Sequence, residues 1–186
     1  MYQLIKLSIV AFLFSTCAGG DPISEGEDSG PFFNMTSYFQ QQIDSLNALG
    51  ISIDKTILLN GRTERHQLED IDFAQELRLF QQSDINRPAW VDKYTAESYV
   101  LPNSNHQLTV YTAIDSTLNV QSLSTVKEPS GEVKSIAVRR RTGSVLSKGT
   151  QNLVYEPQIG YQIKSSQSAK VGGEIDTEIK VSFVQE

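Results

Sequence analysis

The sequence predicts an α+β domain in which N-terminal helices and a hairpin are followed by a curved antiparallel β-meander. Three observations lead to this prediction. Apolar residues recur at helical spacing in two segments ahead of Tyr94, and from there the apolar period changes to two. Turn-forming residues then recur about every 12 residues to the end of the chain, as expected of short antiparallel strands.

Two helices are expected ahead of the meander. The first covers Thr36–Leu49, with a Ser or Thr available as its N-cap and Gly50 where a left-handed residue commonly ends a helix. The second covers Asp72–Gln82 and cannot pass Pro88, because proline lacks the amide hydrogen that a helix needs. Their apolar stripes are formed by Phe39, Ile43 and Leu46 and by Phe73, Leu77 and Phe80.

The other elements are strands joined by tight turns. Ile51–Leu59 and Thr63–Leu68 flank Asn60-Gly61, which tolerates the positive φ angles of a type I′ hairpin turn. About seven strands follow, separated by turns at Pro102–Asn105, Asp115–Thr117, Pro129–Gly131, Thr142-Gly143, Pro157–Gly160 and Gly172-Gly173. In the last strand Ile175, Thr177, Ile179, Val181 and Phe183 share one face.

A meander of this length twists and coils, and its apolar face must be covered. We therefore expect a half-barrel wrapped around the helices. A closed lipocalin-like barrel is the alternative, because closure also hides an apolar face.

The only cysteine, Cys17, comes shortly after a short apolar segment, Leu7–Phe14. That segment is too short to cross a bilayer as a helix and follows Lys6, as the core of a cleavable signal does. Leu13-Phe14-Ser15-Thr16 ahead of the cysteine resembles the lipobox of bacterial lipoproteins. The resemblance implies a signal peptide over residues 1–16 and lipidation of Cys17. Ordinary secretion with cleavage at nearby small residues is the alternative.

Residues 17–30 are expected to form a lipidated, flexible tether, and residues 31–186 a single α+β domain. The tether carries no apolar period but four acids, at Asp21, Glu25, Glu27 and Asp28. With the helix and sheet pattern, this organisation resembles that of uncharacterised small lipoproteins of the Bacteroidota. The resemblance implies an acyl anchor in the cell envelope, at either face of the outer membrane. A net charge of -6 disfavours nucleic acid as a partner.

No motif points to catalysis, a metal or a cofactor. His66 and His106 stand apart and lack the spacing of a ligand pair, and nucleophile-elbow, phosphate-loop and dinucleotide patterns do not occur. The carboxylates Glu69, Asp70 and Asp72 are typical of the first turn of a helix, where they complement its dipole. We expect a noncatalytic protein, with a hydrolase that uses a carboxylate and a histidine as an alternative.

Five residues are candidates for ligand binding. Trp90, Tyr94 and Tyr111 are aromatic residues able to line a pocket, or alternatively to fill the core. Arg139 and Arg141 share one side of a strand and could hold a phosphate or carboxylate, or alternatively form a solvated strand end.

The leading hypothesis is an envelope lipoprotein that binds an apolar small molecule or an envelope protein on the concave face of its sheet. The alternative is a structural or interaction lipoprotein with a fully packed core and no ligand cavity.

Overall fold

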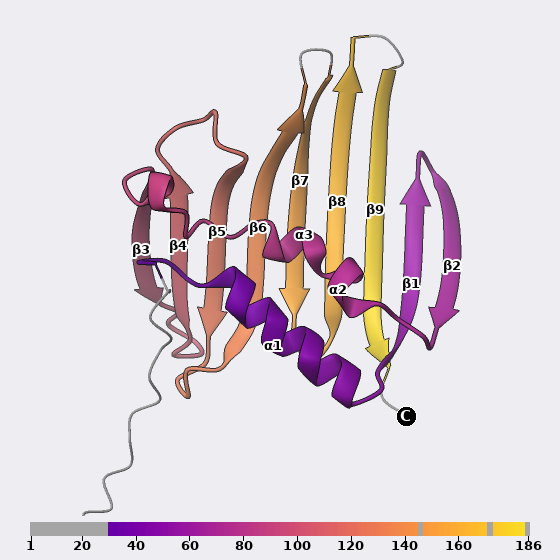
Figure 1. The fold of residues 1–186 in the computed structure, drawn as a ribbon, viewed down its shortest axis with the longest axis horizontal. Coiled ribbons are helices and arrows are strands. Elements are labelled where there is room, and N and C mark those ends of the chain that lie inside the picture. Colours follow the sequence, from indigo (N-terminus) through magenta and orange to yellow (C-terminus); the bar gives the residue numbers. More distant parts are fainter. Residues whose placement is uncertain (1–29, 145–146, 171–172, 185–186) are drawn as a thin grey trace, which may run out of the picture.

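The computed structural model describes residues 30–144, 147–170 and 173–184, so Cys17, the predicted signal and most of the predicted tether lie outside the described residues. One nine-stranded antiparallel sheet dominates the fold, and the helices lie against one of its faces (Figure 1). The strands are β1 (Ser52–Leu59), β2 (Arg62–Leu68), β3 (Tyr94–Val100), β4 (Gln107–Ala113), β5 (Val120–Lys127), β6 (Val133–Gly143), β7 (Ser147–Glu156), β8 (Gly160–Ala169) and β9 (Gly173–Val184).

The sheet is open. Its order is β2-β1-β9-β8-β7-β6-β5-β4-β3, so β2 and β3 are its two edges. The alternative of a closed barrel is therefore wrong. The predicted hairpin joins the meander through β1, which pairs with β9 in a register that places Ile53 opposite Phe183. This long-range pairing lies outside what local sequence patterns predict, and it extends the seven-strand meander to nine strands.

The first helix, α1 (Met35–Ala48), is confirmed with a different N-cap. The Asn34 side chain, and not a Ser or Thr, accepts a hydrogen bond from the Ser37 amide at 2.8 Å. Either choice satisfies an otherwise unpaired amide of the first turn. Gly50 follows the C-cap Leu49 with a φ of 60°, as predicted.

The predicted second helix is divided into α2 (Phe73–Glu76) and α3 (Arg78–Gln81). Leu77 between them has φ -94° and ψ 2°, outside helical geometry, so the prediction of one continuous helix is wrong at this residue. Its side chain is nevertheless fully buried, like those of the rest of the predicted stripe. Helical spacing could not reveal the break, because the stripe is the same on both sides of it.

The 3-10 helix η1 (Pro88–Trp90) follows, with Pro88 in its first turn.

The turns lie largely where predicted. Asn60 and Gly61 have φ angles of 47° and 83°, which is the pattern of a type I′ hairpin. Thr142 and Gly143 instead belong to the end of β6. That placement differs from the prediction because Gly143 still pairs with Lys148 of β7.

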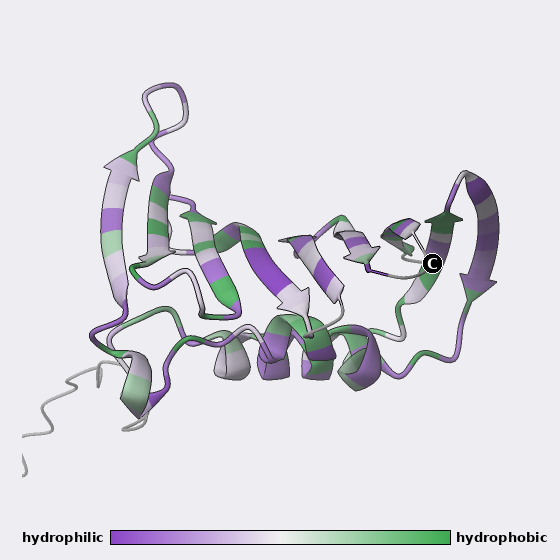
Figure 2. Ribbon diagram, turned by 90° about the horizontal axis from the view of Figure 1, so that it is seen from above, coloured by the Kyte–Doolittle hydropathy of each residue, from purple (hydrophilic) through white to green (hydrophobic). Residues whose placement is uncertain are grey.

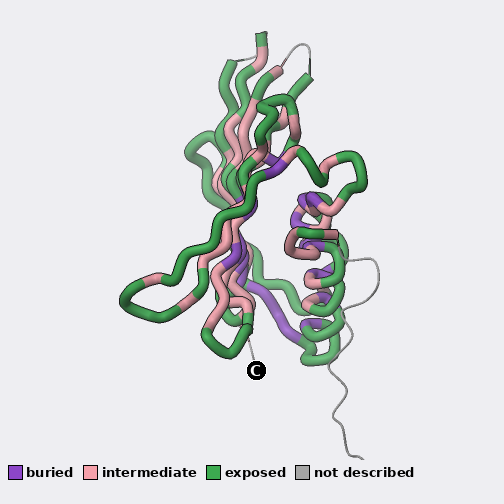
Figure 3. The backbone as a smooth tube through the Cα atoms, turned by 90° about the vertical axis from the view of Figure 1, so that its left-hand side faces the viewer, coloured by how far each residue is buried: buried purple, intermediate pink, exposed green. Residues whose placement is uncertain are grey.

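The core lies between the helices and the sheet, where aromatic rings meet. Phe39 of α1 stacks on Phe80 of α3 with ring centroids 5.0 Å apart, and Tyr155 of β7 meets Phe39 edge-on at 4.9 Å. All three side chains are fully buried. Figures 2 and 3 show the helices confined to one side of the sheet, and Figure 1 shows β6 to β9 extending beyond them. One whole face of the sheet is thus left open.

The longest helix in the described ranges has 14 residues, and none there has the length and hydropathy of a membrane-spanning helix.

Candidate functional site

A hollow of about 400 Å³ lies on the face of the sheet away from the helices. Lys55 reaches α2 on the helix side, and alternate residues of a strand point to opposite faces, so Leu58 points to the open side. The hollow spans β1, β9, β8 and β7, with the β1–β2 turn beside it. Its lining residues are Leu58, Asn60, Gly61, Thr150, Asn152, Lys164, Ser165, Ser166, Asp176, Thr177 and Glu178.

The register of the strands arranges these side chains in two rows that cross the sheet. Directly paired residues of neighbouring strands share a face, so each row can be followed from partner to partner. The first row contains Leu58, Glu178, Lys164 and Asn152. The second row contains Asp176, Ser166 and Thr150. Seven side chains from four strands therefore present their polar groups, and one apolar group, on the same surface.

The predicted arginines continue both rows onto the next strand. Arg139 pairs with Asn152 and Arg141 pairs with Thr150, and both arginines are exposed. The Arg141 guanidinium also donates a hydrogen bond to the Ser116 carbonyl. These two residues lie beside the hollow, on the same face.

Arg140 points to the other face, as alternation requires. Its Nη1 donates to the Leu79 carbonyl of α3 at 3.3 Å, whereas its buried Nε has no partner among the described residues. Burial first, and the positive charge of Arg87 second, lower the pKa of this guanidinium. Arg140 therefore acts as a contact between β6 and α3.

The predicted aromatic residues lie on the helix side and are separated by the sheet from Arg139 and Arg141. The Tyr94 hydroxyl donates to the Val120 carbonyl at 2.8 Å, and the Trp90 ring lies 6.3 Å from that of Tyr94. Tyr111 and Tyr94 both meet the ring of Phe32, at 5.6 and 5.8 Å. The five predicted residues do not form one site, because these three pack at the edge of the core.

Contacts within the hollow hold part of it in place. Lys164 Nζ lies 3.7 Å from Glu178 Oε1, which also accepts a hydrogen bond from Gln162 Nε2 at 2.5 Å. Asn60 and Asp176 exchange two hydrogen bonds of 3.1 Å through the backbone of Asp176, so the hairpin turn is fastened to β9. Within the described ranges the Asp176 carboxylate has no ion-pair partner, and it is available to a ligand.

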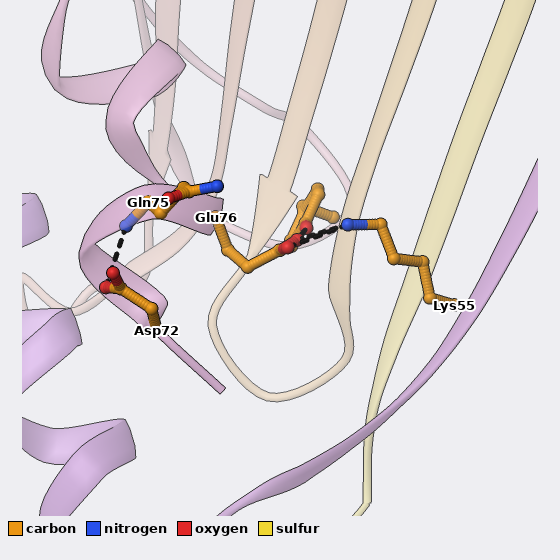
Figure 4. Close-up of polar contacts among 5 residues, drawn as sticks. Lys55, Asp72, Gln75 and Glu76 are labelled. Carbon is orange, nitrogen blue, oxygen red and sulfur yellow. Dashed lines mark hydrogen bonds and ion pairs between the residues drawn. The ribbon is translucent and has the colours of Figure 1, made fainter. Parts of the chain in front are cut away.

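A second polar cluster lies under the helices, and Figure 4 shows its labelled members. Lys55 Nζ donates to both oxygens of Glu76 at 2.7 and 2.8 Å, and the Tyr161 hydroxyl donates to the same carboxylate. Burial first, and the hydrogen bond to Glu76 second, raise the pKa of Tyr161 well above its ordinary value. Asp72 accepts from the Gln75 amide and caps α2. Each of these charged groups has an ion-pair or hydrogen-bond partner inside the fold, so we assign the cluster a structural role.

The two histidines lie away from the hollow. His66 Nε2 is 3.7 Å from Glu64 Oε2, and both side chains are exposed on the edge strand β2. His106 precedes β4 and its carbonyl accepts from the Leu101 amide. The described ranges contain no group of three or more His, Cys, Asp or Glu residues placed to hold a metal.

Comparisons with models of protein families, with curated proteins and with solved structures find no match to this chain. Sequence analysis missed Asn152, Lys164, Asp176 and Glu178 as members of a site. Alternation alone places Asp176 and Glu178 on the polar face of β9, but only the register of four strands brings them together with the other two.

Proposed function

We propose that this protein is a noncatalytic, lipid-anchored binding protein of the bacterial envelope. Its ligand or protein partner is held on the open face of the sheet, over β1, β9, β8 and β7. The observation that carries the proposal is the hollow of about 400 Å³ on that face, a size typical of small-molecule sites. The resemblance of the segment before Cys17 to a lipobox supports an acyl anchor at the outer membrane.

The expected ligand is polar, in contrast to the apolar ligand expected from the sequence. Leu58 is the one large apolar side chain among the residues that line the hollow. An apolar ligand would remove water from Lys164, Asp176 and Glu178 without replacing the lost hydrogen bonds, and burial of unpaired charge is costly.

A second candidate is a structural or interaction lipoprotein. The packed rings of Phe39, Phe80 and Tyr155 support it, because they fill the space between helices and sheet. This candidate differs from the first in that it has a fully packed core and no ligand cavity, and acts through an exposed surface.

Binding can be tested by native mass spectrometry of the purified protein, comparing native and denatured masses to detect a copurifying small molecule. Ser166→Trp fills the hollow, whereas Thr112→Trp adds the same ring to an exposed open-face position outside it. We expect a ligand to copurify with the unmodified protein and with Thr112→Trp, but not with Ser166→Trp. A ligand that stays with all three variants would place binding elsewhere.

The anchor can be tested separately by metabolic labelling with palmitate. The unmodified protein should take up label and sediment with membranes, and Cys17→Ser should lose both properties. Label retained by Cys17→Ser would refute lipidation at this residue.

A further inference from the structure

Apart from the ion pair between Lys164 and Glu178, the acidic side chains at the hollow and the basic side chains beside it lie at opposite ends. Asp176 and Glu178 lie on β9, and Arg139 and Arg141 lie on β6, with β8 and β7 between them. Neighbouring strands are about 4.8 Å apart, so the acidic and basic ends of the site are separated by about 14 Å. A ligand that spans the site meets a carboxylate at one end and guanidinium groups at the other.

The two strands between the charged ends offer groups that both donate and accept hydrogen bonds. Asn152 and Thr150 of β7 and Ser166 of β8 carry an amide and two hydroxyls. Lys164 lies 3.7 Å from Glu178, so its charge is largely offset by that carboxylate. A chain of backbone amides has the same mixture of donors and acceptors, so these neutral side chains can form hydrogen bonds with it.

We infer that the hollow binds a short peptide with free termini, its amine at Asp176 and its carboxylate at Arg139 and Arg141. This inference rests on the proposed function. An extended chain advances about 3.3 to 3.6 Å per residue, so about four residues bridge the 14 Å between the charged ends. Capture of terminal charges is a recurring mode of peptide recognition, and guanidinium groups match a carboxylate with paired donors.

Other polar ligands fit the site less well. The lining residues include no aromatic ring on which a sugar could stack. A polyanion such as a nucleotide would meet repulsion from the Asp176 carboxylate at the other end. The separation of charge therefore favours a zwitterion over either class.

The test uses native mass spectrometry of the purified protein with a library of tetrapeptides that have free termini. The same library is prepared with N-acetylated and with C-amidated termini. We expect each modification to lower binding about tenfold or more, because each removes one charge-assisted contact.

Variants then assign each end of the peptide. Arg139→Met should weaken binding of the free library and make it less sensitive to amidation, since Arg141 remains, and Asp176→Asn should make it insensitive to acetylation. Arg65→Met is the matched control and should leave binding unchanged. Arg65 lies on β2, is exposed on the same open face of the sheet, and is outside the hollow.

The outcomes separate this inference from the proposed function. Equal binding of free and blocked peptides would overturn the inference. Failure to bind any peptide, together with a different ligand that Ser166→Trp expels, would overturn the inference and leave the proposed function intact. Absence of both peptide and copurifying ligand would overturn the inference and remove the support for a small-molecule site.

Discussion

Lys55 of β1 and Glu76 of α2 form an ion pair in which the Lys55 Nζ lies 2.7 Å from Oε1 of the carboxylate. The exposed fractions of the two side chains are only 18% and 19%. The pair joins α2, which lies in the connection between β2 and β3, to β1, which pairs with β9. It therefore helps to fix where the helices lie on the sheet.

Glu76→Gln should lower the free energy of unfolding by about 1 to 3 kcal/mol, because it leaves the Lys55 ammonium without its charged partner in a largely buried place. Urea denaturation of the purified protein measures the change. Glu64→Gln is the control, since Glu64 is exposed beside His66, and its effect should stay within about 0.5 kcal/mol. Equal losses of unfolding free energy for the two substitutions would show that this ion pair stabilises the fold no more than an exposed charge does.

Gly160→Ala should destabilise the protein more than any other glycine substitution tested. A Cβ at this residue would lie 2.0 Å from the Val181 carbonyl oxygen, and the φ angle is 141°. Gly131 also has a positive φ, 91°, but open space around it, so Gly131→Ala isolates the cost of backbone strain at about 1 to 2 kcal/mol. Thermal unfolding of both variants should show the larger loss at Gly160, and a similar loss at both would exclude the clash.

Phe39→Ala should cost about 3 to 5 kcal/mol of stability, because Phe39 is fully buried between Phe80 and Tyr155. Phe39→Leu keeps most of the volume and should cost clearly less. Chemical denaturation monitored by circular dichroism compares the two. A loss below about 1 kcal/mol for the alanine variant would mean that the packing of Phe39 contributes little to the stability of the core.

Stability should fall at alkaline pH in a way that depends on Tyr94. Burial raises the pKa of Tyr94 from 10.0 to about 12 in the folded protein. Between these values the unfolded chain has released the proton and the folded chain retains it. The contribution of Tyr94 is therefore complete below about pH 10 and lost as the pH rises through about 12.

Urea denaturation between pH 8 and pH 12, in steps of about one pH unit, tests this dependence. Tyr94→Phe should reduce the steepness of the decline by up to about 1.4 kcal/mol per pH unit. Other buried tyrosines with raised pKa values, such as Tyr155 and Tyr161, keep a residual decline in the variant. An unchanged pH profile would show that Tyr94 titrates normally.

Local chemistry predicted much of the fold. Asn60-Gly61 and Gly50 each act on their immediate neighbours, so the sequence around them is sufficient. The break at Leu77 and the pairing of β1 with β9 depend on distant parts of the chain, and no local pattern encodes them.

The candidate site was also predicted only in part, because local patterns identify some of its residues and strand register the others. Alternation along a single strand placed Arg139 and Arg141 together, and both lie on the open face beside the hollow. It could not place Asn152 or Asp176 near them, because that requires the register of β6 to β9. Trp90 and Tyr94 are distinctive in the sequence for their size, and that same size makes them useful for packing against the core.

The pairing of β1 with β9 also determines when the sheet can form. Ser52 and Val184 are partners although 132 residues separate them, so a very long loop must close before this pair gains any stability. A chain that emerges from a ribosome or a translocation channel N-terminus first presents β1 and β2 long before β9 exists. The hairpin must therefore wait, with an unpaired strand edge, until the last strand has been delivered. Deletion of the 12 residues of β9 would remove one strand and also detach two others, β1 and β2, from the sheet.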